Sequence, residues 1–280
     1  MTQQPGDSDG RSGRLAGKAG IITGAASRLG AGIAHRLAAD GARLCLADTD
    51  AARGTALAAA LGDAAFFVQT DLQIDGSIQQ CVREAVDQFG GLDLLVNGAC
   101  TYRDGGIAAE RADWLVACNI NLVGAALTIR AAAPQMAARG GGSIVNIASI
   151  AGKVAMAGRW LYPSTKAALL QLTRCAAADL AADRIRVNSV SPGWTWSHLM
   201  EDLSGGDRAV IDGLAADYHL QGRTSTSDEV AAVVAFLCSD DAACVTGADY
   251  AADGGYSALG PERALPAMRD QLVAAGRIAE

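Results

Sequence analysis

The sequence predicts an α/β fold with one doubly wound parallel sheet and helices on both faces. Three observations support this: short apolar runs alternate with segments of helical length, the alternation repeats six times, and no interdomain linker or internal repeat interrupts it. Crossovers between parallel strands are nearly always right-handed, which fixes the winding. The 280 residues therefore fit one large domain, which we expect to span residues 15–258.

Strands and helices follow from the spacing of the apolar residues. The expected strands are Ala19–Thr23, Arg43–Ala47, Ala65–Gln69, Leu92–Val96, Ser143–Ile147, Arg186–Val190 and Asp249–Ala252. The expected helices include Gly30–Ala39, Ile78–Phe89, Asp113–Ala138, Tyr162–Ala182 and Asp228–Leu237.

Three segments do not follow this alternation of strands and helices. Residues 1–14 are polar and Gly-rich, and we expect a disordered leader. Trp194–Gly222 is long for a connection, which favours a binding loop or lid. Residues 259–280 form a tail in which Leu265, Met268, Leu272 and Val273 have amphipathic spacing. This spacing predicts a short helix, packed on the body or on another subunit, or alternatively a free tail.

Composition excludes several classes of protein. The net charge is −7 and no basic stripe is present, so no nucleic-acid partner is expected. No run approaches the roughly 18 apolar residues of a membrane span, and the first residues lack the apolar stretch of a signal peptide. Seven scattered cysteines without a C-x-x-C pair suggest reduced thiols and a cytoplasmic location. Three dispersed histidines predict no metal site.

A glycine-containing turn, Thr23–Gly30, joins the first expected strand to the first helix. Glycine lets the backbone approach a pyrophosphate, and a helix N-terminus offers free N–H groups and a positive dipole. A plain turn is the alternative interpretation. Asp48 ends the second strand, where a carboxylate can bind an adenosine ribose and repel a 2′-phosphate, so we expect NAD rather than NADP. Asp71, at the end of the third strand, is a candidate contact for the adenine edge.

Tyr162 and Lys166 are the sharpest chemical signal. Four residues apart on a helix, the phenol and the ammonium share one face. Lysine is rare in this arginine-rich chain, so a lysine here indicates a need for a compact ammonium. A solvated helix face is the alternative.

These residues belong to an ordered series of motifs with which the chain resembles the short-chain dehydrogenases/reductases from about Leu15 to Ala258. The family pattern T-G-x-x-x-G-x-G matches Thr23–Gly30, except that Arg28 replaces the middle glycine. N-N-A-G is eroded to Asn97–Cys100, and the asparagine of N-L-x-G matches Asn121.

The later motifs follow in the family's order. Ser149 precedes Tyr162 by thirteen residues, and Tyr162 and Lys166 match Y-x-x-x-K. Pro192-Gly193 follows the sixth strand, Ser197 replaces a threonine that usually touches the nicotinamide, and Asp253–Gly255 matches the closing D-G-G.

The resemblance implies a Rossmann-like sheet, a nicotinamide cofactor, and hydride transfer to or from a secondary alcohol or ketone. It implies that Tyr162 is the acid/base, with a pKa lowered by Lys166 and the cofactor's charge. Ser149 would hold the substrate oxygen, and Asn121 would anchor a water in a proton relay. The implied cofactor contacts are Gly24, Ser27, Arg28, Leu29, Gly30, Asp48, Asp71, Leu72, Asn97, Gly98, Ala99, Tyr162, Lys166, Pro192, Gly193, Thr195 and Ser197.

Aromatic residues near the expected substrate site favour an apolar or cyclic substrate. The candidates are Trp160, Trp194 and Trp196. Arg159 is either a partner for a substrate carboxylate or a solvated loop arginine, and His198 either touches substrate or lies on the surface. The sequence does not name the molecule.

Alternative functions remain open at this point. One is an NADPH-dependent 3-oxoacyl-carrier reductase, which Asp48 and the lack of a basic docking cluster oppose. Another is a catalytically silent nucleotide-binding scaffold, which Arg28 and the altered Gly98–Cys100 favour. Arg28 either turns outward, toward the adenosine phosphate or ribose, or blocks the turn. Alanine-rich helices and the family resemblance predict a closed homotetramer.

Overall fold

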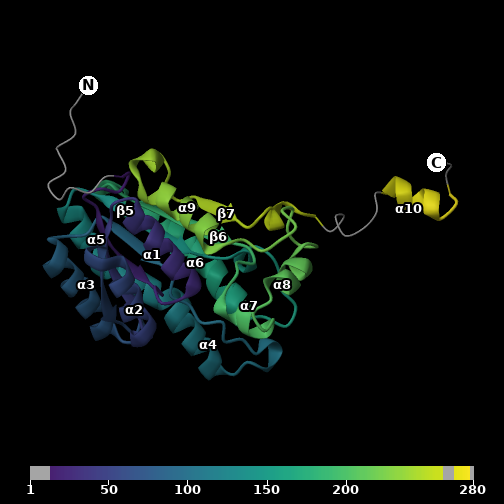
Figure 1. The fold of residues 1–280 in the computed structure, drawn as a ribbon, viewed down its shortest axis with the longest axis horizontal. Helices are drawn as coiled ribbons and strands as arrows, with labels where there is room; N and C mark the ends of the chain where they lie inside the picture. The colour runs from purple at the N-terminus through teal and green to yellow at the C-terminus, as the bar shows by residue number, and fades with distance from the viewer. Residues whose placement is uncertain (1–12, 261–267, 278–280) are drawn as a thin grey trace.

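Seven parallel strands form one sheet with the order β3-β2-β1-β4-β5-β6-β7 in the computed structural model, which describes residues 13–260 and 268–277 (Figure 1). The order reverses between β1 and β4, as in a doubly wound sheet. The predicted fold class is therefore confirmed.

The strands lie close to their predicted positions, with differences of a few residues at some ends. Their sequences are nearly continuous apolar runs because both faces of a parallel sheet are covered by helices. The strands are β1 Ala19–Thr23, β2 Arg43–Asp48, β3 Ala65–Gln69, β4 Leu94–Asn97, β5 Gly142–Ile147, β6 Ile185–Pro192 and β7 Asp249–Ala252.

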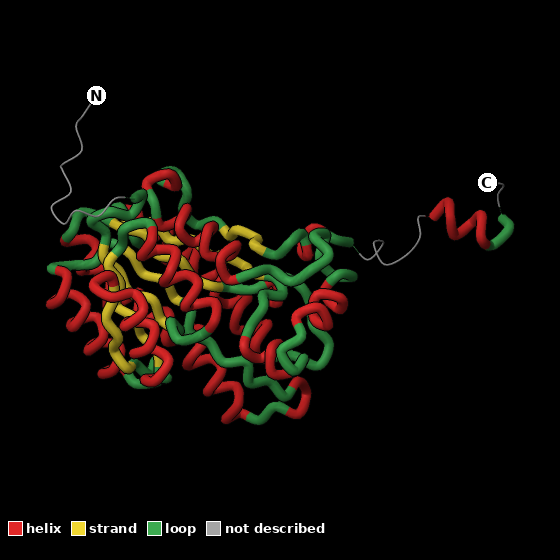
Figure 2. Tube along the Cα trace, viewed as in Figure 1, coloured by secondary structure: helices red, strands yellow, loops and turns green. Residues whose placement is uncertain are grey.

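Two helical layers cover the sheet (Figure 2). Alternate strand residues point to opposite faces, so the apolar side chains divide into two cores. Helices α1 (Arg28–Ala39), α2 (Ala51–Leu61) and α9 (Ser227–Cys238) contribute to one core. Helices α3 (Asp75–Phe89), α5 (Gly124–Ala138) and α6 (Leu161–Asp179) contribute to the other.

The segment expected as one long helix at Asp113–Ala138 has three parts. Helix α4 (Arg111–Cys118) continues through a π turn at Asn119–Val123 into α5. Over Arg111–Ala138 this helix is long and apolar enough to cross a membrane, with mean hydropathy 1.5 in its most apolar window and 39% of that window buried. Core helices of globular proteins have the same properties, and α5 here packs beside α3.

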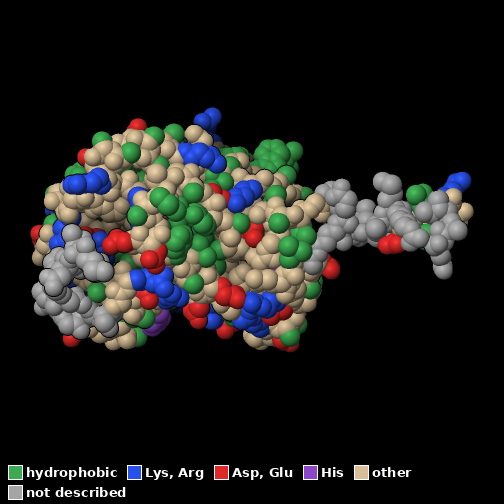
Figure 3. Space-filling view, turned by 90° about the horizontal axis from the view of Figure 1, so that it is seen from above, with side chains coloured by type: hydrophobic (Ala, Val, Ile, Leu, Met, Phe, Trp, Pro, Cys, Tyr) green, Lys and Arg blue, Asp and Glu red, His purple; other side chains and the backbone are tan. Residues whose placement is uncertain are grey.

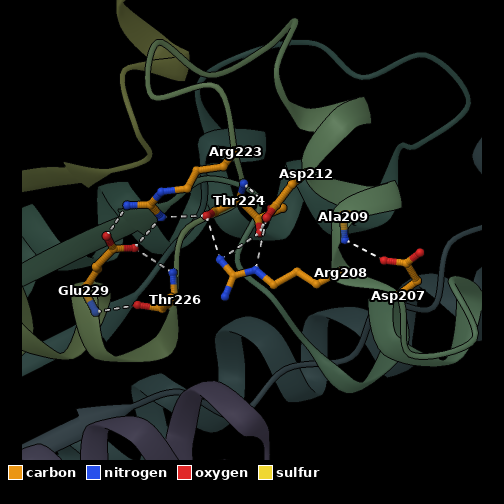
Figure 4. A network of polar contacts seen from close by, with 8 residues as sticks. All are labelled: Asp207, Arg208, Ala209, Asp212, Arg223, Thr224, Thr226 and Glu229. Atoms are coloured by element: carbon orange, nitrogen blue, oxygen red, sulfur yellow. Dashed lines mark hydrogen bonds and ion pairs between the residues drawn. The ribbon is translucent and has the colours of Figure 1, made fainter.

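The segment expected as a binding loop or lid, Trp194–Gly222, contains two helices, α7 (His198–Leu203) and α8 (Arg208–Ala215). We call this segment the lid. Polar contacts fasten α8 to the chain before α9 (Figure 4): Asp212 accepts a hydrogen bond from the Thr224 N–H at 2.9 Å. Arg223 pairs with Glu229, and this hydrogen bond, helped by the Thr226 N–H, lowers the pKa of Glu229 to about 2.

The structure describes only parts of the two chain ends. Most of the expected leader lies outside the described residues. Within the tail, Met268–Ala274 forms helix α10, at the place of the predicted helix, and its described residues beyond Arg269 are exposed except for the half-buried Val273.

Acidic and basic side chains are interspersed on the face of the molecule that Figure 3 shows, and they form no basic stripe there.

Candidate active site

A cavity of about 820 Å³ opens at the carboxyl ends of the strands, where α/β sheets bind their ligands. One end of it, which we call the cofactor end, is lined by residues that follow β1, β2 and β3. The other, the substrate end, lies between the Ser149–Tyr162 segment and the lid.

The glycine-containing turn at the cofactor end is closely packed. Gly24 has φ +71°, and a β-carbon there would lie 2.6 Å from the Ala99 nitrogen. A β-carbon at Gly30 would lie 2.2 Å from the Gly24 oxygen. Ser27 caps α1 by accepting from the Gly30 N–H at 3.0 Å. The first turn of α1 is thereby drawn against the β1 end and offers its free N–H groups to an anion.

Arg28 begins α1 and is not among the residues that line the cavity. It has no left-handed backbone angle, so the missing glycine causes no strain. Its side chain leaves the cavity and pairs with Glu201 on α7 of the lid. The sequence predicts that Arg28 either reaches the adenosine phosphate or ribose or blocks the turn. In the structure it instead pairs with a carboxylate of the lid, and its effect on cofactor binding stays a prediction.

Asp48 lines the cofactor end and also organises it. One of its carboxylate oxygens accepts from the Ala26 N–H at 2.9 Å, and the other accepts from the Asp50 N–H at 3.0 Å. Asp48 thus joins the end of β2 to the turn that follows β1. Asp71 also lines the cavity, where it accepts from the Gln73 N–H.

Ser149, Tyr162 and Lys166 meet at the boundary between the two ends. Ser149 follows β5, and Tyr162 and Lys166 lie one turn apart on α6. The Lys166 ammonium donates to the Ile147 carbonyl at 2.6 Å and lies 5.7 Å from the centre of the Tyr162 ring. All three side chains are buried but line the cavity.

Burial raises the pKa of Tyr162, and the charge of Cys100 raises it further. Hydrogen bonds from Ser149 and Tyr102 lower it, but the net change is upward. Burial lowers the pKa of Lys166. In the protein without cofactor, desolvation outweighs the neighbouring hydrogen-bond donors, and the lowering of the Tyr162 pKa by Lys166 together with the cofactor's charge stays a prediction.

Asn121 lies within the π turn, fully engaged with protein groups. Its amide nitrogen donates to the Thr101 carbonyl and the Thr165 hydroxyl, while its oxygen accepts from the Thr101 N–H at 2.7 Å. Asn121 thus fastens the segment after β4 to α6. Asn97 donates to Asn146 behind the cavity wall.

The start of α6 is fixed by a carboxylate distant in sequence. Asp104 accepts from the N–H groups of Trp160, Leu161 and Tyr162 at 3.0–3.1 Å, and from that of Gly106. Burial raises the Asp104 pKa, but these four donors bring it below its usual value. The helix end that carries Tyr162 is therefore capped and oriented.

The Pro192-Gly193 turn is held by a buried histidine. The Trp194 N–H donates to His219 Nε2 at 3.1 Å, so the ring hydrogen is on Nδ1, 3.1 Å from the Ala215 oxygen. A β-carbon at Gly193 would lie 2.8 Å from the same Nε2, which explains the glycine. The ring of Trp194 stacks on that of Tyr218 at 5.3 Å and lines the cavity.

Known proteins share this architecture. A family model described as enoyl-(acyl carrier protein) reductase matches residues 24–257. The cis-4-hydroxycyclohexanecarboxylate dehydrogenase of Sinomonas cyclohexanicum is 39% identical over 256 residues, 88% of this chain and 98% of its own. The chain belongs to the short-chain dehydrogenase/reductase family. It is accordingly an oxidoreductase with a nicotinamide cofactor.

Two further known proteins are similar over the same share of this chain. The trans-4-hydroxycyclohexanecarboxylate dehydrogenase of Sinomonas cyclohexanicum is 37% identical over 255 residues, covering 88% of this chain and 95% of the relative. The crystal structure of gox2181 matches with a TM-score of 0.81 and 31% identity, over 88% of this chain and 98% of that one.

Most of the residues expected from the short-chain dehydrogenase/reductase pattern line the cavity. They are Gly24, Ser27, Leu29, Asp48, Asp71, Leu72, Gly98, Ala99, Ser149, Tyr162, Lys166, Pro192, Gly193, Thr195 and Ser197, together with Trp194 and Trp196 of the lid. Five others do not line it: Arg28, Gly30, Asn97, Asn121 and Trp160. Gly30 and Asn121 act on the site through packing and hydrogen bonds, and Trp160 is 49% exposed outside the cavity.

Sequence reasoning passed over three side chains around Tyr162. Tyr102 stacks on the Tyr162 ring at 4.8 Å, Cys100 lines the cavity, and Asp104 caps α6. Cys100 is the last residue of the Asn97–Cys100 motif, and Tyr102 follows two residues later. Their closeness to that motif could therefore have identified them as candidate site residues. Asp104 gives no local signal because it acts on a helix 56 residues further along. No cluster of metal-binding side chains occurs within the described residues.

Proposed function

We propose that the protein is an NAD-dependent dehydrogenase, or ketone reductase, for a cyclic secondary alcohol. The observation that carries this proposal is the placement of Tyr162, Ser149 and Lys166 at the junction of a glycine-lined cofactor end and an apolar substrate end. A proton donor is thereby available beside the position where a nicotinamide would meet an alcohol.

The protein's own groups handle the proton and the developing charge. Tyr162 gives its hydroxyl proton to a ketone oxygen, or takes one from an alcohol, at its phenolic oxygen. Ser149 donates a hydrogen bond to the reacting oxygen and stabilises its partial negative charge. Lys166, already oriented by the Ile147 carbonyl, would hold the cofactor ribose. The nicotinamide, when bound, supplies or accepts the hydride.

The cofactor end fits a dinucleotide. The close approaches at Gly24 and Gly30 leave a cradle that a β-carbon would fill, facing the free N–H groups of α1. Asp48 supports NAD because its carboxylate lies where a 2′-phosphate would be repelled. The neighbouring Arg53 pairs with Asp50 at 3.7 Å, so its guanidinium already has a carboxylate partner in the chain.

The substrate end supports an apolar ring as the substrate body. Trp194, Trp196, Leu199, Met200 and Leu203 line it, which gives large apolar surfaces on the lid side. Two relatives are named for oxidation of a hydroxylated cyclohexane ring, which agrees with a wall of this kind.

A panel assay tests the proposal. Cyclohexanol, 4-substituted cyclohexanols, open-chain secondary alcohols and the matching ketones are incubated with NAD(H) and NADP(H), and absorbance of the reduced nicotinamide is followed. We expect ring alcohols with NAD to give the highest kcat/KM. Acetoacetyl thioester with NADPH is included as the carrier-reductase arm. NADH binding without any turnover would instead favour a silent scaffold.

We also propose a homotetramer in the cytoplasm. The apolar helix α4–α5 keeps exposed residues such as Leu115 and Val123, which suits a subunit contact. All seven cysteines lie in the described residues as free thiols, which suits a reducing compartment. Light scattering should return four chain masses over a wide concentration range, and a constant single-chain mass would refute the assembly.

A further inference from the structure

Charge is unevenly distributed along the cavity. The acidic residues that line it, Asp48, Asp50 and Asp71, all lie at the cofactor end. Among the described residues that line the substrate end, none is Asp or Glu, whereas Arg159 and Lys166 are cationic. A negatively charged group would therefore meet no carboxylate among the side chains that line the substrate end, since Asp104, which pairs with Arg159, does not line the cavity.

Arg159 lies at the right place to use this asymmetry. It follows Met156 in the segment between Ser149 and Tyr162, and it lines the cavity. Its guanidinium carbon is 5.2 Å from the centre of the Tyr162 ring. A group bound to Arg159 would accordingly be separated from the substrate oxygen at Tyr162 by about the width of one small ring.

The guanidinium of Arg159 keeps most of its hydrogen-bonding capacity. In the described part of the chain its ionic partner is Asp104, whose oxygen is 3.9 Å from Arg159 Nε, too far for a hydrogen bond. Asp104 already accepts from four backbone N–H groups. It can orient Arg159 electrostatically, while the planar fork of donors remains available to another carboxylate.

We propose that Arg159 binds a carboxylate of the substrate, so that the preferred substrates are ring alcohols that carry an acid group. The inference rests on the proposed function for the reacting end of the molecule. The apolar lid residues cover the ring, Tyr162 and Ser149 meet the hydroxyl, and Arg159 forms a bidentate, charge-assisted contact with the acid.

Ligand binding tests the inference independently of turnover. Cyclohexanecarboxylate and the neutral cyclohexanecarboxamide, which have similar shapes, are titrated calorimetrically into the full-length protein, with and without saturating NADH. We expect the acid to bind at least tenfold more tightly than the amide. Arg159→Gln should abolish this preference, and Arg159→Lys should keep part of it because a point charge remains. The matched control is Arg83→Gln on the exposed side of α3, which should change nothing.

Kinetics separate this inference from the proposed function. With 4-hydroxycyclohexanecarboxylate and cyclohexanol as substrates, Arg159→Gln should raise KM for the acid alone, by tenfold or more. An equal fall in kcat for both alcohols would mean that Arg159 only tunes Tyr162, and would overturn the inference. So would equal binding of acid and amide to the unmodified protein. If the acid binds through Arg159 but no ring alcohol is oxidised, the proposed function fails and the carboxylate site stands.

Discussion

The cofactor end and the substrate end of the cavity are built by different means. At the cofactor end, β1 and β2 end side by side, and the Asp48 carboxylate and backbone N–H groups connect them. At the substrate end, the lid depends on side-chain pairs: Arg28 with Glu201 at α7, and Asp212 with Thr224 at α8. Main-chain geometry sets the first. At the second, side-chain contacts between distant segments add to the backbone hydrogen bonds that join Trp194 and Trp196 to Ser225.

This difference teaches where change is tolerated. A substitution at the cofactor end disturbs packed backbone, since a β-carbon at Gly24 or Gly30 would meet main-chain atoms. A substitution in a lid pair removes one partly exposed contact, which is usually worth about 0–1 kcal/mol. Substitutions at the cofactor end should therefore weaken cofactor binding readily, whereas the lid should accept change and substrate preference should be easy to alter.

The largest expected effect concerns Tyr162, where the two ends meet. Tyr162→Phe removes the transferable proton and should reduce kcat about 10²–10⁴-fold, while NADH binding is retained. Steady-state kinetics and NADH titration measure the two separately. The matched control is Tyr250→Phe on β7, outside the cavity. Turnover near that of the unmodified protein would exclude Tyr162 as the acid/base.

The raised pKa of Tyr162 gives the second prediction. Oxidation needs the phenolate and reduction needs the phenol, and burial favours the neutral phenol. The kcat/KM for alcohol oxidation should thus rise about tenfold per pH unit below the apparent pKa, while reduction should fall above it. A flat oxidation profile from pH 6 to 9 would mean that Tyr162 is already ionised or does not limit the rate.

Asp48 tests the cofactor end. Asp48→Ala removes the charge that opposes a 2′-phosphate and should shift the ratio of kcat/KM for NAD over NADP by about 1–3 kcal/mol, or roughly fivefold to 150-fold. The KM for NAD should also rise, because the Ala26 N–H loses its acceptor. Asp87→Ala on the exposed side of α3 is the control. The assignment fails if the unmodified enzyme prefers NADP.

The smallest effect is expected for the Arg28–Glu201 pair. Arg28→Gly should weaken NADH binding by no more than about tenfold, or 1.4 kcal/mol, because the side chain lies outside the cavity. A double-mutant cycle with Glu201→Gln should give a coupling of about 0.2–1 kcal/mol in the free energy of unfolding, measured by denaturant titration. If only the glycine variant binds NADH, Arg28 blocks the site after all.

Much of the fold and the cofactor end was predictable because the signals there are local. Continuous apolar runs identify buried parallel strands, and the turn Thr23–Gly30 carries its own glycines. Tyr162 and Lys166 follow from a single helical spacing. In each case the residues that interact are near one another in the chain, so their spacing is visible in the sequence.

The remaining features depend on contacts between distant residues. Asp104 caps a helix 56 residues later, and Arg28 meets Glu201 across 173 positions. The lid helices α7 and α8 are short and held by tertiary contacts, so periodicity did not reveal them. His219 gave no sign of its role, because its function depends on burial against the Pro192-Gly193 turn.

The π turn at Asn119–Val123 determines which face of α5 is turned toward the core. A π turn accommodates one extra residue in a helix, and each residue of an α-helix turns its neighbours by about 100°. Deleting one residue here would rotate α5 relative to α4 and carry Ile129 and Met136 away from the core. It would also move Asn121 off Thr165. The extra residue therefore keeps the apolar residues of α5 turned toward the core while Asn121 stays in contact with Thr165. An insertion or deletion here should be tolerated only when a second change restores the rotation of α5.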